Sequence, residues 1–261
     1  MKKKTSVIWT FVILILLISL LTLFGFNFNI NYDFINITDE SSQDNSFKSG
    51  VSKINKFDLN ENIDFDYNNF TNLIIVPGGQ TRYSAGPKSE GQSYYEVAKL
   101  MDNQMFNNRE FLNSVTTEEF AKDSFENLLF SICRFKEFTN FFPKTITIIG
   151  FKFKKFRFEN LHLKAIKFNV KNFEYIGFDL PLQDRRTAEE GEKKFSVLPF
   201  QNDLYGCRDP LSRKKKNRNP FKRVSNPYKE TCPELRTLFE YCPEGIKSNI
   251  NYFIDQTVCF R

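Results

Sequence analysis

An almost entirely apolar run dominates the start of the chain. Residues Val7–Phe24 read VIWTFVILILLISLLTLF, and these 18 residues are long enough to cross the hydrocarbon core of a bilayer as a helix. A cleaved signal peptide is the alternative, but the run is longer than the apolar region of such a peptide and no small-x-small cleavage site follows it. The run therefore predicts an uncleaved transmembrane anchor over residues 7–24.

The charges beside this run predict its orientation. Lysines at positions 2–4 precede it, whereas Asp33, Asp39 and Glu40 follow it. Because basic residues stay on the cytosolic side, we expect residues 1–6 to be a cytosolic tail. The rest of the chain is then expected in a lumen, that of the endoplasmic reticulum or another secretory compartment.

The segment after the anchor has the character of a stalk. Residues 25–70 are rich in Asn, Asp, Ser and Lys and have no sustained hydrophobic period. Sequons at Asn36 and Asn69 would accept glycans on the lumenal side of a membrane. Sequons also arise by chance in an Asn-rich chain, so they support this topology only weakly.

The pattern over residues 71–200 predicts an α/β domain. The apolar segment Leu73–Val76 runs into a Pro-Gly-Gly turn, as a buried parallel strand does at its carboxyl end. The short, β-branched segment Thr145–Gly150 predicts a second strand, and Phe173–Leu180 predicts a third. Strand, helix and strand in alternation indicate a mostly parallel sheet.

A helix is predicted between the first two of these strands, from Thr116 to about Phe138. Thr116 can act as its N-cap, with Glu119 as the partner in a capping box. Apolar residues then recur at helical spacing and form the expected core face. They are Ala121, Phe125, Leu128, Leu129, Ile132 and Phe135. After the second strand, FKFKKFRF alternates Phe with basic residues and fits either an extended segment or the start of a helix.

Charge is concentrated near the carboxyl end, in a basic, cysteine-containing extension expected over residues 201–261. The net charge of +6 is modest for 261 residues, which argues for a local patch and against a protein that binds polyanions over its whole surface. The run Arg213–Arg218 could bind phosphate groups or an anionic membrane surface, or it could be a solvated loop. Nucleic-acid binding is disfavoured by the expected topology and by the lack of a known module.

Four of the five cysteines lie in this extension, namely Cys207, Cys232, Cys242 and Cys259. In an oxidising lumen they would form two disulfide bridges, whose connectivity the sequence leaves open. Zinc binding is the competing account, but there is no CxxC pair and the single histidine, His162, is distant in sequence, so no metal site is expected. Cys133 lies in an apolar helical segment and is expected to be an inert core thiol.

The most specific local signal is GGQTRYSAGPKSEGQSYY, which begins at Gly78. Gly78 and Gly79 would let backbone N–H groups approach an anion closely, and a following helix would add its positive amino end. Gln80, Arg82 and Glu90 would lie at the edge of the sheet where such folds bind ligands. The simpler alternative is that a tight turn between strand and helix requires the glycines.

Polar residues at the start of the predicted helix form a second group, comprising Glu119, Asp123, Glu126 and Asn127. They either complement the helix dipole or, in the case of Glu126 and Asn127, point toward the glycine turn. His162 could be a general base, but our default interpretation is a packed or hydrogen-bonded helix residue.

The chain resembles the fungal membrane-anchored branch of the DUF218 (YdcF/SanA/ElyC-like) family over about residues 72–235. The resemblance lies in the glycine turn, the predicted helix with its polar start, FKFKKFRF with His162, and the later segments YGC, KKKNRNPFKR and TCPEL. The resemblance implies a Rossmann-like doubly wound domain of mostly uncharacterised activity, with bacterial relatives tied to envelope integrity and one linked to S-adenosylmethionine. The family's glycine turn and glutamate correspond to Gly78, Gly79 and Glu90. Its helix motif corresponds to Ser124, Glu126 and Asn127.

The chain departs from this family at one point. Members have a first strand ending in Val-Pro-Gly, a long helix, and a second strand ending in Ser-Gly-Gly-Gln-Thr-Arg. Here LIIVPG runs directly into GQTR, although a βαβ crossover needs about 30 residues. Either an exon is missing from the sequence or the protein has lost a strand and a helix. A sheet shortened by one such unit is therefore expected.

Together these observations predict a single-pass membrane protein whose lumenal domain binds a small anionic or nucleotide-like ligand through the backbone amides of the glycine turn. S-adenosylmethionine is the one cofactor that the resemblance implies. The alternative is a non-enzymatic scaffold or interaction protein of the secretory pathway or cell envelope. The sequence assigns neither a substrate, a reaction nor a protein partner.

Overall fold

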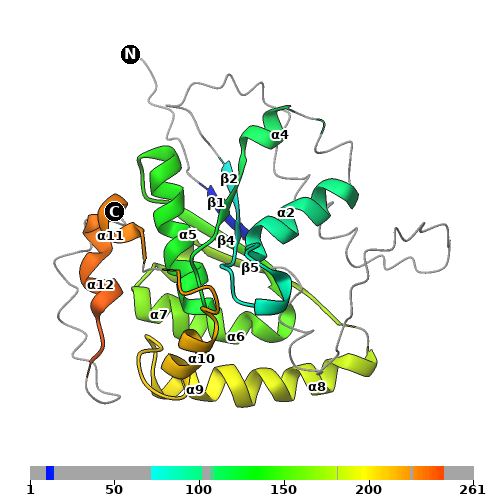
Figure 1. Ribbon diagram of the computed structural model, residues 1–261, viewed down its shortest axis with the longest axis vertical. Helices are drawn as coiled ribbons and strands as arrows, with labels where there is room; N and C mark the ends of the chain where they lie inside the picture. The colour runs from blue at the N-terminus through cyan, green and yellow to red at the C-terminus, as the bar shows by residue number, and fades with distance from the viewer. Residues whose placement is uncertain are drawn as a thin grey trace.

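The computed structural model of the chain describes residues 10–14, 72–101, 107, 109–180, 182–223 and 226–243. Five parallel strands form one sheet in the order β3-β2-β1-β4-β5 (Figure 1). The strands are β1 (Thr10–Leu14), β2 (Asn72–Pro77), β3 (Val115–Glu118), β4 (Thr145–Phe151) and β5 (Phe173–Phe178). Because all five are parallel, their carboxyl ends lie at one edge of the sheet.

The central strand comes from the apolar run at the start of the chain. Thr10 pairs with Asn72 of β2 on one side and with Thr145 of β4 on the other, so β1 has a partner along both edges. At residues 10–14 the structure thus has a strand where the sequence predicted a transmembrane helix. A strand inside a parallel sheet is also a continuous apolar run, which explains the ambiguity.

The other predictions for the first 70 residues, namely the cytosolic tail, the rest of the anchor, the stalk and both sequons, lie outside the described residues. Within the part of the chain that the structure describes, none of the helices has the length and apolar character that a membrane span requires. Membrane attachment and a lumenal location stay predictions.

Strand β1 also corrects the expectation of a shortened sheet. With β1 in the centre, Asn72–Pro77 is the second strand of the domain and not the first. The double glycine therefore belongs to the loop after the second strand, where the resembling family has it. The connection from β1 to β2 runs through residues outside the described ranges.

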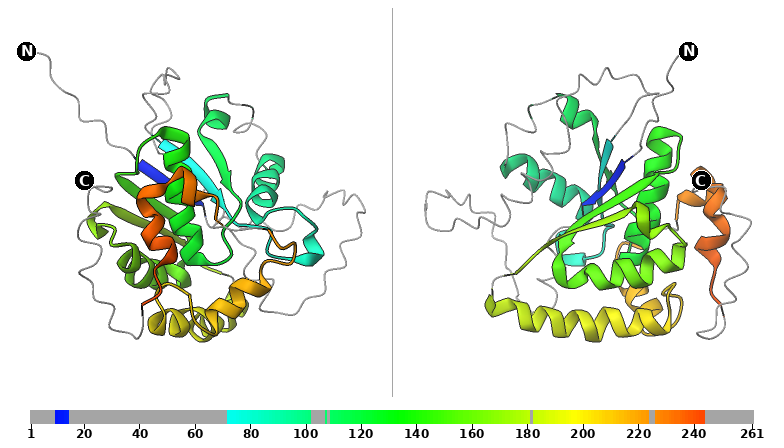
Figure 2. Two further views of the ribbon diagram at one scale, coloured as in Figure 1. Left: turned by 60° about the vertical axis from the view of Figure 1, so that its left-hand side comes forward. Right: turned by 180° about the vertical axis from the view of Figure 1, so that it is seen from behind.

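Helices cover both faces and one edge of this sheet. Helix α2 (Glu90–Met101) lies on one face and α5 (Ser124–Thr139) on the other, as Figures 1 and 2 show. Helices α8 (Leu182–Glu192), α9 (Leu198–Asn202) and α10 (Leu211–Asn217) lie across the edge at which the strands end (Figure 1). The other helical elements are η1 (Tyr83–Ala85), α4 (Arg109–Asn113), η2 (Lys152–Lys154), α6 (Lys155–Arg157), η3 (Phe158–His162), α7 (Leu163–Ile166), η4 (Val170–Asn172), η5 (Lys193–Val197), α11 (Tyr228–Thr231), η6 (Pro233–Leu235) and α12 (Arg236–Glu240).

The start predicted for the long helix is wrong. Val115–Glu118 is strand β3, which pairs with β2, and α5 begins at Ser124. The N-cap is Asp123, whose side chain accepts a hydrogen bond from the Glu126 N–H at 2.8 Å. The β-branched residues that open this segment favour a strand once a neighbouring strand is available. The predicted core face is confirmed, because all six of its apolar side chains are buried.

The other predicted elements agree more closely with the structure. The second predicted strand is β4 and the third is β5, with ends shifted by one or two residues. The FKFKKFRF segment is the beginning of a helical stretch, in which η2, α6, η3 and α7 follow one another without a break.

The carboxyl-terminal segment packs on the same core. Helices α11 and α12 lie along α5 in Figure 1, and Leu211, Tyr228 and Leu235 are buried in one hydrophobic cluster with the apolar face of α5. The Tyr228 ring lies 5.2 Å from the ring of Phe130, measured between centroids. Residues 201–240, which the sequence assigned to an extension, therefore contribute to the body of the domain.

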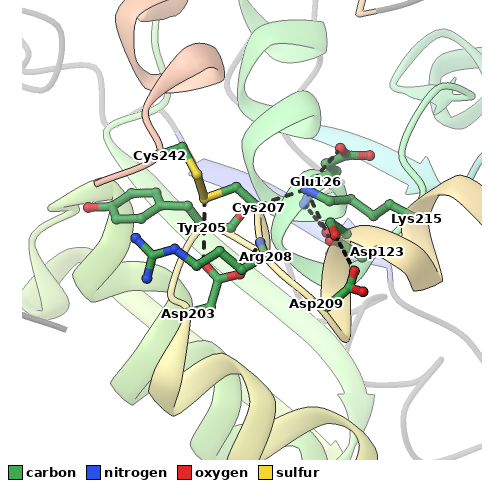
Figure 3. The surroundings of a disulfide bond; sticks show 10 residues. Asp123, Glu126, Asp203, Tyr205, Cys207, Arg208, Asp209, Lys215 and Cys242 are labelled. Carbon is green, nitrogen blue, oxygen red and sulfur yellow. Dashed lines mark hydrogen bonds and ion pairs between the residues drawn. A yellow bond between two sulfur atoms is a disulfide. The ribbon is translucent and has the colours of Figure 1, made fainter. Parts of the chain in front are cut away.

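One disulfide bridge is present in this segment, between Cys207 and Cys242 (Figure 3). One bridge is therefore confirmed, whereas the prediction that Cys232 is also bridged is wrong. Cys232 is a buried free thiol, and Cys259 lies outside the described residues. Cys133 is likewise buried and free, and burial together with the neighbouring Cys232 thiol raises its pKa well above the usual range. A thiol with a raised pKa is a poor nucleophile, as expected for a core cysteine.

Candidate functional site

The double glycine after β2 serves close packing inside the protein. The Gly78 N–H donates to the Glu118 carbonyl oxygen at 2.8 Å, and the Gly79 N–H donates to the Ala121 carbonyl oxygen at 2.9 Å. A Cβ on Gly79 would lie 2.6 Å from that Ala121 oxygen, so only glycine allows the approach. The expectation that these amides are free to bind an anion is therefore wrong, because both already have acceptors.

Glu118, at the end of β3, fixes the segment against which the glycines pack. Its Oε1 accepts hydrogen bonds from the Phe120 N–H at 2.7 Å and the Tyr228 hydroxyl at 3.1 Å. Its Oε2 accepts one from the Ala121 N–H at 3.2 Å. Burial raises the pKa of Glu118 to about 7 despite these donors. The sequence interpretation missed this role because it assigned Glu118 to a helix.

Glu90 lies beside the glycine turn, at the start of α2. A Cβ on Gly78 would lie 2.6 Å from the Cβ of Glu90, which shows how closely the two pack. Burial raises the pKa of Glu90, whereas the positive charges of Arg218, Lys154 and Arg82 act to lower it. Three cations from separate segments of the chain therefore lie near this one carboxylate.

These three residues belong to a larger set of basic side chains, which we call the cationic cluster. Its members are Arg82, Lys154, Arg157, Lys214 and Arg218. Burial, with the positive charge of Arg157, lowers the pKa of Lys154 to about 8. Burial also lowers the pKa of Arg218, and the charges of Arg157 and Arg82 act in the same direction. The cations are thus close enough to disfavour one another's charge.

One member of the cationic cluster has a dedicated partner. The Arg157 side chain donates to both carboxylate oxygens of Glu192, at 2.5 and 3.0 Å, and both residues are buried. Lys215, next to the cluster, lies 3.7 Å from a carboxylate oxygen of Asp123 and 3.6 Å from one of Glu126 (Figure 3). The charges of Arg157 and Lys215 are therefore balanced within the protein.

Lys214 and Arg218, both from the α10 region, lack such partners. Arg218 donates to the Lys122 carbonyl oxygen at 3.0 Å, and Lys214 donates to the Phe195 carbonyl oxygen at 3.1 Å. Both of these acceptors are backbone oxygens, and among the described residues neither side chain forms an ion pair with a carboxylate. Burial and the charges of Arg218 and Arg157 lower the pKa of Lys214 to about 8. The carboxylates that act on them, Glu90 and Asp123 on Arg218 and Asp123 and Glu192 on Lys214, do so from beyond ion-pair distance.

The start of α5 lies next to the cluster and holds a serine–histidine contact. The Ser124 Oγ lies 2.8 Å from His162 Nε2. His162 is fully buried, burial lowers its pKa well below the usual value, and the Phe200 ring lies 4.6 Å away between centroids. His162 is thus neutral at physiological pH and packed among aromatic rings. The Asp123 Oδ2 is also buried and accepts no hydrogen bond from a described residue.

The remaining predicted site residues have other roles. Gln80 donates to the Pro87 carbonyl oxygen at 2.5 Å and closes the loop between β2 and α2. Asn127 donates through its backbone to the Asp123 carbonyl oxygen, and its side chain forms no hydrogen bond within the part of the chain that the structure describes. Of the residues predicted from sequence, Arg82 and Glu90 lie at the cationic cluster, and Glu126 contacts the adjacent Lys215.

Sequence reasoning missed four members of the cluster as site residues, although two signals pointed toward them. Lys154 and Arg157 lie in the FKFKKFRF segment, which was noted only for its alternation. Lys214 and Arg218 lie in the basic run that was proposed to bind phosphate, but nothing in the sequence places that run next to Glu90. The fold brings these segments together because η2 follows β4 and α10 crosses the same edge.

A known protein shares much of this sequence. The chain is 35% identical over 232 residues to the uncharacterized protein YOR238W of Saccharomyces cerevisiae, an alignment that covers 72% of this chain and 75% of the yeast protein. The chain belongs to the YOR238W family. No protein-family model matches the chain, and no solved structure matches it. Membership in the YOR238W family carries no ligand or activity with it, and the resemblance to DUF218 stays a prediction.

Proposed function

We propose that this protein binds a small anionic ligand, such as an organic phosphate, at the cationic cluster. The observation that carries the proposal is the pair Lys214 and Arg218, which are partly buried next to other cations and form no ion pair with a carboxylate of the described residues. Partly buried charges without a counter-ion destabilise a folded protein. A bound anion would place negative charge in direct contact with these two side chains.

The sheet topology supports the same location. A parallel sheet whose first strand lies in the centre, with the second and third strands on one side and the fourth on the other, has the strand order of doubly wound, Rossmann-like folds. In such folds ligands bind outside the carboxyl ends of the strands, where the order reverses. Lys154 follows β4, directly beside that point. S-adenosylmethionine, the cofactor that the family resemblance implies, carries a net positive charge and therefore does not fit a site that binds an anion.

The membrane anchor is not part of this proposal. Residues 10–14 form the central strand, and the rest of the apolar run lies outside the described residues, so a membrane anchor stays a prediction. The anion-binding proposal rests on the cluster alone and holds wherever in the cell the protein resides.

Thermal unfolding of the full-length protein with and without ligand tests the proposal. We expect inorganic pyrophosphate, nucleotides or sugar phosphates at millimolar concentration to raise the midpoint, because a ligand that binds only the folded state stabilises it. The variant Arg218→Gln should bind at least about tenfold more weakly, since one charge-assisted contact is lost.

The matched control is Arg213→Gln, which changes the same residue type within α10, the helix that Arg218 follows. Arg213 is 67% exposed and forms an ion pair with Asp209 at 3.2 Å, so its replacement should leave ligand binding unchanged. If a folded wild-type sample shows no shift with any of these anions, the proposal is wrong. That result would favour the alternative of a scaffold or interaction protein.

A further inference from the structure

An exposed pair of aromatic rings lies beside the cationic cluster. Tyr83, in η1, stacks on Phe221 with ring centroids 5.8 Å apart and an angle of 11° between the planes. Tyr83 is nevertheless 79% exposed, so the ring face that Phe221 does not cover is open to solvent. Tyrosine is enriched at binding surfaces because its ring is apolar and its hydroxyl can stay in water.

The two rings are on the same segments as two members of the cluster. Tyr83 directly follows Arg82, and Phe221 lies three residues after Arg218. In the left view of Figure 2 the segment after α10 crosses to the loop between β2 and α2, which brings the rings together. Arg82 also acts electrostatically on Arg218. Flat apolar surface and positive charge are therefore adjacent.

Both segments are held in place without a ligand. In the first, the Gly86 N–H donates to the Tyr83 carbonyl oxygen at 3.0 Å, which closes η1. In the second, the side-chain oxygen of Asn219 accepts from the Arg223 N–H at 2.9 Å. The Arg223 guanidinium in turn donates to the Glu119 carbonyl oxygen at 3.0 Å. A surface that is already ordered loses little entropy when a ligand binds.

We propose that the anionic ligand is a nucleotide, whose phosphates contact Arg218 and Lys214 and whose base stacks on the open face of Tyr83. This inference rests on the proposed anion binding and adds the class of ligand. Phosphate groups bind to cationic side chains such as those of the cluster. A planar base stacks on an exposed aromatic ring, and any base can do so because every base has a π-face. An inorganic or sugar phosphate would use only the cluster and leave the Tyr83 ring in water.

Calorimetric titration of the full-length protein compares two probes that each carry two phosphates, ADP and inorganic pyrophosphate, in the same buffer with EDTA. If the base stacks on Tyr83, wild-type protein should bind ADP at least about fivefold more tightly than pyrophosphate. Tyr83→Ala should abolish the preference for ADP and leave the affinity for pyrophosphate unchanged. Tyr83→Phe, which keeps the ring, should keep the preference for ADP. Arg218→Gln should weaken both probes.

The control variant is Phe141→Ala, which removes another exposed aromatic ring. Phe141 is 51% exposed and follows the carboxyl end of α5, at the opposite end of the sheet, so its loss should not affect either probe. Equal affinities for ADP and pyrophosphate in wild type, or equal weakening of both by Tyr83→Ala, would overturn the nucleotide assignment and leave anion binding intact. If neither probe binds folded wild-type protein, anion binding itself is wrong.

Discussion

Replacing Lys214 by methionine tests whether the cationic cluster carries uncompensated charge. Lys214 has a pKa of about 8 in the folded protein, against a usual value of 10.5. At about 1.4 kcal/mol per pKa unit, holding its charge in the folded state costs at most about 3 kcal/mol. Lys214 is only partly buried, so screening by solvent reduces this cost to about 1 kcal/mol. Methionine keeps most of the side-chain volume and removes the charge.

The cost of holding the Lys214 charge in the folded protein falls as the pH rises. Between about pH 8 and pH 10.4 the unfolded chain holds a proton on Lys214 that the folded protein has lost, so wild-type stability rises with pH across this range. Below pH 8 both states are protonated and the full cost is present. The Lys214→Met variant has no titratable group at this position, so its stability does not include this pH-dependent cost. By pH 9.5 a little more than half of this cost is relieved, so Lys214→Met should, relative to wild type, be roughly 0.5 kcal/mol more stable at pH 7 than at pH 9.5.

Urea unfolding followed by circular dichroism at the two pH values measures this difference. The hydrogen bond from Lys214 to the Phe195 carbonyl oxygen is lost at both pH values, so its contribution cancels from the comparison. Lys216→Met, an exposed position on the same helix, is the control and should show no such dependence. A stability difference for Lys214→Met that is the same at both pH values would refute the reasoning.

Two further predictions follow from the packing. Gly79→Ala should lower the free energy of unfolding by about 2 kcal/mol in urea titrations, because its Cβ would lie 2.6 Å from the Ala121 carbonyl oxygen; a loss below about 0.5 kcal/mol would contradict so close an approach. Cys133 and Cys232 are buried free thiols and should react with iodoacetamide only after unfolding in guanidinium, as mass spectrometry of the labelled protein would show. Rapid labelling of the native protein at Cys133 would contradict its burial.

The apolar run at the start of the chain shows how far pattern alone can predict. An almost entirely apolar run of 18 residues fits a membrane helix, and a five-residue piece of it also fits a buried strand. What distinguishes the two is the presence of β2 and β4, whose edges pair with Thr10–Leu14 on both sides. That pairing joins residues far apart in sequence, so no local signal could reveal it. The α/β class itself was predicted correctly, because the other strands and α5 have short and regular patterns.

The start of α5 was mispredicted for a similar reason. Thr116 and Glu119 have the spacing of a capping box, but the Arg134 side chain donates to Thr116 Oγ1 at 2.9 Å and to the Thr117 carbonyl oxygen at 3.2 Å. These contacts, together with pairing to β2, hold the segment extended. Asp123 was recognised only as a polar residue of this region, although Glu126 three residues later gives it the same N-cap signature as Thr116.

The sequence predicted where the candidate site lies, at the carboxyl edge of the sheet, but it predicted only some of the residues that form it. Gly78 and Gly79 correctly marked the carboxyl edge of the sheet, but glycine permits close contact with any neighbour, and here the neighbour is the protein's own backbone. The hypothesis of anion binding therefore moves from backbone amides to side chains. Lys154 and Arg218 could not be grouped from sequence, since 64 positions separate them and only the fold makes them neighbours.

The disulfide between Cys207 and Cys242 has a consequence for the basic residues of the carboxyl-terminal segment. The two cysteines are 35 positions apart and enclose a covalent ring that contains Lys214, Arg218 and Phe221. The segment that carries these three residues is thus held at both ends by the disulfide. Proteolytic cleavage anywhere inside this ring would leave both fragments attached, so a nicked protein would keep its binding groups until a reductant released them.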